Sequence, residues 1–323
     1  MSRSVLWRSL QTILILLLLS YVCFALMTLM PGDPVELMIT SNPKIGSEDM
    51  QRLRMLYGLD QPTPLRYYHW LTSFLKGDLG YSRTYRVPVM DLLAPRMLNT
   101  FYLAMSSLVL ALLIAVPLGV LSALRTGTWI DSLCGVLSSL SLSTPSFWTG
   151  LVLILIFGGW WPILPPGGTF SIGLSEDSPL DAVLDRLSYL VLPVVSLAFV
   201  QLGRFLRLTR GAMMEALKND YIRTARAKGL PVSTILWRHA FRNALLPLIT
   251  IVALSFSSLF SGALITETVF AYHGVGHLLY EAIRSNDFNL AMVAFLFSMT
   301  AVFAFNGLAD LAYGWADPRI SHH

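Results

Sequence analysis

Side chains that could do chemistry are few in this chain, and His273 and His277 form the most suggestive pair. Their spacing of four would place both imidazoles on one face of a helix, where they could bind a metal ion such as zinc. Gly274 and Gly276 lie between them, and two glycines argue against a regular helix. A regular helix is therefore the less favoured interpretation, and metal binding stays an alternative.

Sequence patterns of nucleotide-hydrolysing and metal-dependent enzymes are absent from the chain. It contains no Gly-x-x-x-x-Gly-Lys-Ser/Thr loop, which would cradle the phosphates of ATP, and no His-Glu-x-x-His motif. Cys23 and Cys134 lie in apolar runs, so we interpret them as small hydrophobic residues rather than as a disulfide or a metal pair. No catalytic residue, cofactor site or metal site is predicted in this chain.

Charged side chains concentrate in residues 215–247, EALKNDYIRTARAKGLPVSTILWRHAFRNALLP. The apolar positions of its first part recur at roughly helical spacing: Tyr221, Ile222, Ala225 and Leu230. The triplet Gly229-Leu230-Pro231 then predicts the end of one short helix and the start of another, because glycine accepts the helix-end conformation and proline tolerates a helix start. Two short amphipathic helices separated by a break would make a platform for another protein.

The composition predicts an integral membrane protein. Hydrophobic residues make up 54% of the 323 residues and charged residues only 13%, whereas a soluble domain has about 25% charged residues. The mean hydropathy is +0.61. The formal net charge of +4 does not indicate nucleic-acid binding, because the basic residues cluster beside apolar runs, as membrane topology requires.

Uncharged runs predict an all-α fold with about six transmembrane helices, since roughly 20 apolar residues span a bilayer. One run is too long for a single helix, and we expect its helix to end near Gly158, with a kink at Pro145. The runs cover residues 9–32, 97–124, 132–175, 187–203, 243–266 and 288–309.

The distribution of basic residues predicts that both termini are cytoplasmic. Residues 203–243 hold nine Lys and Arg against two Asp and Glu, which the positive-inside rule places in the cytoplasm. Arg204, Arg207 and Arg210 mark the cytoplasmic end of the fourth run and lie near one helix face. They would contact either an ATPase subunit or lipid headgroups, and both interpretations stay open.

Residues 30–98 differ from the apolar runs and predict a small external helical insertion after the first helix. They carry eight Lys and Arg against seven Asp and Glu, together with aromatic and turn residues. A stretch of this length is long for a plain loop. The chain therefore divides into a first segment and helix at 1–29, the insertion at 30–98, and a transmembrane core at 99–323 that contains a cytoplasmic loop at 211–243.

The charged stretch resembles the coupling-loop signature of permease subunits of binding-protein-dependent ABC importers, in the dipeptide, oligopeptide and nickel branch. The similarity rests on YIRTARAKGL at 221–230, RHA at 238–240 and RNALLP at 242–247. The wider family opens this loop with Glu-Ala-Ala. Here Gly229 aligns with the family glycine but Arg223 occupies the Glu position, as fits the peptide branch. LMPGDP at 29–34, YGLDQP at 57–62, GDLG at 77–80 and DPRI at 317–320 also resemble this branch.

The resemblance implies a MetI-like permease in the bacterial inner membrane that forms half of a translocation pathway. It implies a second, different permease subunit, two cytoplasmic ATPase subunits that hold ATP and Mg, and an extracytoplasmic solute-binding protein. Di- and oligopeptides are the expected cargo, with nickel chelates, glutathione or another small solute as alternatives. The residues expected to couple to the ATPase are Asp220, Tyr221, Ile222, Arg223, Thr224, Ala225, Arg226, Ala227, Lys228, Gly229 and Leu230.

Polar residues inside the apolar runs are candidates for lining the pathway, although small polar residues also let membrane helices pack closely. Two other functions stay open: an ion-driven secondary transporter, for which the runs offer almost no ionisable residue, and a membrane scaffold that transports nothing. The candidate pathway residues are Ser143, Thr144, Gln201, Ser255, Ser258 and Ser261.

Overall fold

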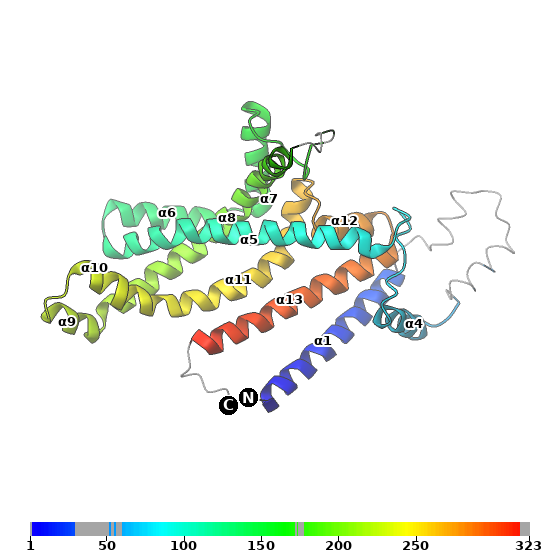
Figure 1. Cartoon of the computed structure of the whole chain (residues 1–323), viewed down its shortest axis with the longest axis horizontal. Helices are drawn as coiled ribbons and strands as arrows, with labels where there is room; N and C mark the ends of the chain where they lie inside the picture. The colour runs from blue at the N-terminus through cyan, green and yellow to red at the C-terminus, as the bar shows by residue number, and fades with distance from the viewer. Residues whose placement is uncertain are drawn as a thin grey trace. The chain divides into compact units, whose positions relative to one another are not determined.

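The computed structural model describes residues 2–29, 52, 55, 60–171, 173 and 178–316, and they are predominantly helical (Figure 1). Tyr81 and Pro88 form an isolated antiparallel β-bridge. The helices, with π-helical segments labelled η, are α1 Ser2–Thr28, α4 Thr63–Leu75, α5 Val89–Leu124, α6 Trp129–Ser143, α7 Ser146–Leu153, η1 Ile154–Trp160, α8 Pro179–Lys218, α9 Asp220–Ala227, α10 Val232–Thr234, η2 Ile235–Phe241, α11 Arg242–Val269, α12 Val275–Arg284 and α13 Phe288–Ala316.

Four described helices are long and apolar enough to cross a membrane by themselves, and one bent pair raises the number to five. The four spans are Leu10–Thr28 of α1, α5, α8 and Phe288–Leu308 of α13. The run predicted at 243–266 lies within α11, some of whose side chains are outside the described part of the chain. The count of six helices and the cytoplasmic termini stay predictions. Much of the expected insertion, including 30–51, and the tail motif at 317–320 also lie outside the described residues.

The bent pair corrects the expected kink at Pro145, because α6 and the α7–η1 helix meet at 102°. Proline lacks an N–H and disfavours a helical conformation in the residue before it. Thr144 is accordingly extended, with φ −91° and ψ 123°. Its hydroxyl and its N–H both donate to the carbonyl of Leu140, at 2.7 and 3.0 Å. The helix after the break ends at Trp160, close to the predicted Gly158.

The chain divides into two compact units, of which the first comprises Met1–Arg96, Leu278–Thr300 and His322–His323. An aromatic cluster joins its segments: the ring of Phe24 lies edge-on to Tyr67 and Phe288, with centroids 5.6 and 5.1 Å apart. The hydroxyls of Ser20 and Tyr67 are hydrogen bonded at 2.7 Å. These contacts hold α4 against α1.

The second unit, Met97–His277 with Ala301–Ser321, contains the close pair α6 and α8. Ser138 donates to the carbonyl of Gly203 at 2.9 Å. Ser141 donates to the carbonyl of Phe199 at 2.5 Å and accepts from the N–H of Gly203 at 2.8 Å. The Ser141 hydroxyl thus bridges the groups that would bond directly in a regular helix. These contacts favour a packing role for Ser138 and Ser141.

Gly203 and Gly211, both in α8, allow a matched test of this contact. A Cβ at Gly203 would overlap the carbonyl oxygen of Ser138, whereas one at Gly211 meets nothing within 4 Å. We expect Gly203→Ala to destabilise the chain by about 1–3 kcal/mol through overpacking. Gly211→Ala should be neutral or slightly stabilising, since alanine favours helix. Thermal unfolding in detergent measures both; equal melting temperatures for the two variants would contradict the close contact.

Candidate functional site

Helix α9 is a short amphipathic helix whose end is set by Gly229. The N–H of Leu230 donates to the carbonyl of Ala225 at 3.3 Å, and that of Gly229 to the carbonyl of Arg226 at 3.0 Å. This pair of bonds is the Schellman motif, which requires a left-handed residue just after the helix. Gly229 has φ +70°, so the predicted helix stop is confirmed together with its cause. Pro231 then precedes α10 in extended conformation.

The inner face of α9 is buried in the second unit. Ile222 is 0% exposed and Ala225 is 5% exposed. They pack into a cluster from the ends of α5 and α8 and from η2 and α11: Val120, Ala123, Met213, Ala216, Ile235, Ala240 and Ala244. Tyr221 and Leu230, expected on the same apolar face, are instead 38% and 37% exposed. The face of α9 that is anchored in the core is therefore narrower than the spacing predicted.

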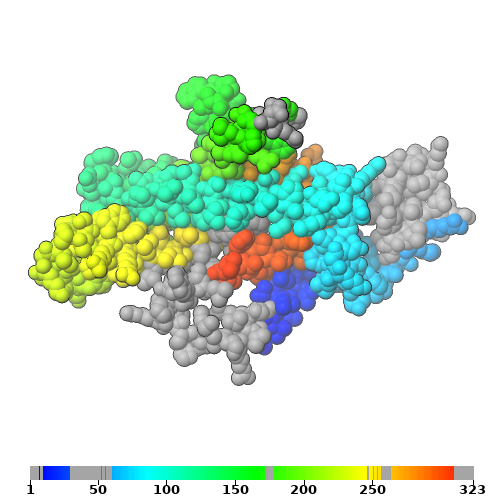
Figure 2. Space-filling model, viewed as in Figure 1, coloured from blue at the N-terminus to red at the C-terminus, as the bar shows by residue number. Residues whose placement is uncertain are grey.

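The outer face of α9 carries exposed positive charge. Arg223, Arg226 and Lys228 are all exposed. Arg223 lies 3.5 Å from Asp220, but their side chains are 81% and 94% exposed, and such a surface pair contributes little. Val232 and Trp237 of the following segments add exposed apolar surface, at 79% and 55%. Figure 2 shows this segment at the surface in lime and yellow. Large exposed apolar groups beside arginines are typical of a protein interface.

All residues predicted to couple to an ATPase lie in α9 or its C-terminal cap. Thr224 donates its hydroxyl to the carbonyl of Asp220 at 3.0 Å, and Ala227 is exposed. Nine of these eleven residues are exposed, whereas Ile222 and Ala225 are buried in the core.

Comparison with known protein families shows to which family the chain belongs. The family described as binding-protein-dependent transport system inner membrane component matches residues 115–322, and its N-terminal companion matches residues 1–104. The chain belongs to this family. It is a permease subunit of an ABC importer, a transport component with several apolar helices.

Relatives along the whole permease support the assignment. The oligopeptide transport system permease protein AppB of Bacillus subtilis is 36% identical over 100% of both chains. The probable D,D-dipeptide transport system permease protein DdpB of Escherichia coli is 39% identical, over 93% of this chain and 92% of that protein. A solved inward-facing MetNI methionine ABC transporter has a TM-score of 0.55 at 16% identity, over 71% of this chain and 98% of that chain. That likeness shows the fold alone.

The candidate pathway residues are spread over three helices of the permease. Ser143 is exposed and Thr144 half-buried at the α6–α7 break. Gln201 of α8 is half-buried, and its amide nitrogen is buried without a partner among the described residues. Ser255 of α11 is 2% exposed, while the side chains of Ser258 and Ser261 lie outside the description. None of the described hydrogen bonds joins these side chains, and pathway lining stays a prediction.

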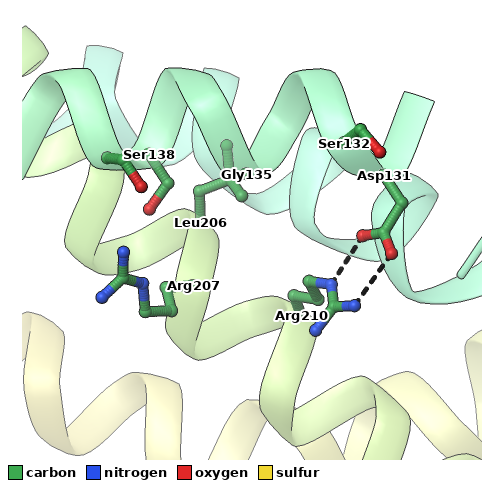
Figure 3. A pocket seen from close by; sticks show the side chains of 8 residues that line it. Asp131, Ser132, Gly135, Ser138, Leu206, Arg207 and Arg210 are labelled. Carbon is green, nitrogen blue, oxygen red and sulfur yellow. Dashed lines mark hydrogen bonds and ion pairs between the residues drawn. The ribbon is translucent and has the colours of Figure 1, made fainter. Parts of the chain in front are cut away.

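An ion pair that the sequence did not predict connects α6 and α8 of the permease. Arg210 donates to both carboxylate oxygens of Asp131, at 2.7 and 2.9 Å (Figure 3). The hydroxyl of Ser122 and the N–H of Gly127 also donate to this carboxylate, at 2.5 and 3.0 Å. Such a bidentate pair fixes geometry as well as charge. The only sequence signal was that each residue lies at the edge of an apolar run.

A buried carboxylate is the second feature that sequence reasoning missed. Glu267, 0% exposed, accepts from the hydroxyl of Thr100 at 2.6 Å and from the N–H of His277 at 3.0 Å. Thr100 in turn accepts from the N–H of Val275 at 2.8 Å. A lone glutamate at the end of an uncharged run was the available signal. Glu267 therefore holds the first turn of α12 against Thr100 of α5, within the second unit.

Gly274 and Gly276, between the two histidines, allow the backbone to pass close to the Glu267 carboxylate. A Cβ at Gly274 would overlap the Glu267 carboxylate, and one at Gly276 would overlap the backbone of Leu264. Helix α12 begins only at Val275, so His273 precedes it, and the two imidazole centroids are 6.1 Å apart. Burial and the negative charge of Glu267 raise the pKa of Tyr272 in the adjacent turn. Within the part of the chain that the structure describes, no three metal-ligating side chains cluster.

Proposed function

We propose that this permease subunit forms half of the translocation pathway of an ATP-driven importer of di- and oligopeptides. The relatives named above are an oligopeptide and a probable D,D-dipeptide permease, and they align over nearly the whole chain. Solute selectivity in such a system would be shared with an extracytoplasmic binding protein and a second, different permease subunit. The chain would lie in the bacterial inner membrane, with about six helices and with both termini and α9 in the cytoplasm.

Energy would come from two cytoplasmic ATPase subunits that bind ATP and Mg. The observation that carries this proposal is that α9 has one face buried in the core and one exposed cationic face. Its inner residues Ile222 and Ala225 are buried among the ends of the long helices, while its cationic face is exposed. A partner that binds the exposed face would move α9 together with the helices behind it, because packed elements shift as rigid bodies.

Transport would then follow from a population shift between two packings of the helices. ATP binding would close the ATPase pair, draw α9 with it and favour the outward-facing state. A loaded binding protein would release its solute into the cavity, and hydrolysis would restore the inward-facing state. Each partner shifts the equilibrium only by its differential affinity for the two states.

Reconstitution of the complex in liposomes tests the proposal. We expect ATP-dependent accumulation of labelled di- and oligopeptides when the binding protein is present, and none with a non-hydrolysable analogue. Excess unlabelled peptide should compete, whereas nickel chelate and glutathione should not; competition by either of these would move the substrate assignment to it. Uptake that ceases when an ionophore collapses the ion gradient would indicate a secondary transporter, and a scaffold would move no solute.

A further inference from the structure

A cavity opens between α6 and α8, close to the Asp131–Arg210 pair (Figure 3). Its volume is about 320 Å3. Ser132, Ser139 and Arg207 supply polar groups to its lining. A Cβ at Gly135 would meet nothing within 4 Å, so the cavity extends to the backbone of α6. We call this space the α6–α8 cavity.

The charge balance of the α6–α8 cavity is positive. Arg210 and Asp131 neutralise each other, and both oxygens of Asp131 also accept bonds from Ser122 or Gly127. Arg207 is exposed and forms no ion pair with any described residue, and the exposed hydroxyl of Ser139 has no described partner. One guanidinium and one hydroxyl are therefore available to an anion.

A neighbouring face of α6 is apolar and exposed. Leu133, Val136 and Leu140, spaced three and four apart and so on one helix face, are 58%, 56% and 55% exposed. Trp129, at the start of the helix, is 74% exposed, as is typical of aromatic side chains at a membrane interface. A ligand that fits both surfaces needs an anionic group and a long apolar chain.

We propose that the α6–α8 cavity binds the phosphate of an anionic phospholipid headgroup, with the acyl chains along Leu133, Val136 and Leu140. The Arg207 guanidinium presents several N–H donors to the phosphate oxygens, and Ser139 adds a hydroxyl. Basic pockets between transmembrane helices on the cytoplasmic side are suited to such headgroups. A peptide carboxylate would satisfy Arg207 but would leave the apolar strip unused.

Lipid titration of the detergent-solubilised complex, followed by native mass spectrometry, tests the proposal. We expect phosphatidylglycerol to bind more tightly than phosphatidylcholine, and Arg207→Gln to weaken its first binding event by about fivefold. Arg204→Gln is the matched control, because Arg204 is exposed one turn away in α8 and does not line the cavity. Gly135→Leu, which fills the cavity and keeps its charge, should weaken binding comparably.

Each other outcome overturns the proposal. Equal losses for Arg204→Gln and Arg207→Gln would indicate general surface attraction rather than a site. Inorganic phosphate that binds in an Arg207-dependent manner, with phosphatidylglycerol unaffected, would identify free phosphate as the ligand. Labelled peptide binding lost in Arg207→Gln would place the cavity in the solute path. If Arg207→Gln does not fold, Gly135→Leu decides, and unchanged lipid binding by it excludes the site. None of these readouts requires transport.

Discussion

Replacement of Glu267 by alanine is expected to destabilise the permease by about 2–5 kcal/mol, because it leaves buried donors without their acceptor. The carboxylate accepts from the hydroxyl of Thr100 and from the N–H of His277. Glu267 is itself 0% exposed, so water has little access to the groups left behind. Thermal unfolding of the detergent-solubilised protein measures the loss, and folded yield from membranes provides a second readout.

Glu267→Gln keeps the volume of the side chain but removes its negative charge and one of its two acceptor oxygens. The carboxylate uses one oxygen for Thr100 and the other for His277. A carboxamide has a single acceptor oxygen and an NH2 group. One of the two donors would then face another donor, so we expect most of the destabilisation to persist. Glu215→Gln, at an exposed position of α8, is the matched control and should melt like the unchanged protein.

Gly274→Ala tests the same contact from the opposite side. The added methyl group would overlap the Glu267 carboxylate, and the buried side chain has no room to retreat. We expect Gly274→Ala to destabilise the protein as Glu267→Ala does. If all three variants retained the melting temperature of the unchanged protein, the buried carboxylate would not hold the first turn of α12.

The sequence predicted those features of the structure that depend on residues close together in the chain. Residues 97–124, 187–203 and 288–309 lie within α5, α8 and α13, since a long uncharged run specifies a long helix. The stop at Gly229 was predictable because it depends on one residue and its helix. Pro145 predicted that the helix is interrupted there. The angle of 102° between α6 and the α7–η1 helix was not predictable, because it depends on packing against other helices.

Contacts between distant residues could not be predicted from one sequence. Thr100 and Glu267 are 167 positions apart, and Asp131 and Arg210 are 79 apart. Helical periodicity indicates which residues share a face, but not which neighbour covers that face. For this reason Tyr221 appeared equivalent to Ile222 in the spacing, although only Ile222 is packed into the core.

Gly229→Val is expected to lower uptake about tenfold or more while ATP hydrolysis by the assembled complex continues. A β-branched residue at φ +70° is strained by roughly 1–2 kcal/mol or more. No atom lies within 4 Å of a Cβ built at this position, so the defect would come from the backbone and not from a clash. The end of α9 would lose its Schellman bonds and transmit less of the ATPase movement. Measurements of peptide uptake and ATP hydrolysis in the same liposomes give the coupling ratio.

Two controls separate this effect from general backbone strain. Gly229→Asn should retain most of the coupling, because asparagine tolerates the left-handed conformation. Gly77→Val places the same strain in the first unit, where Gly77 has φ +86° and also has no neighbour within 4 Å of a Cβ. An unchanged ratio of uptake to hydrolysis in assembled Gly229→Val would refute the lever role of α9. A ratio lowered equally in Gly77→Val would assign the loss to strain anywhere in the chain. Loss confined to Gly229→Val follows only if the movement of the ATPase passes through the end of this helix.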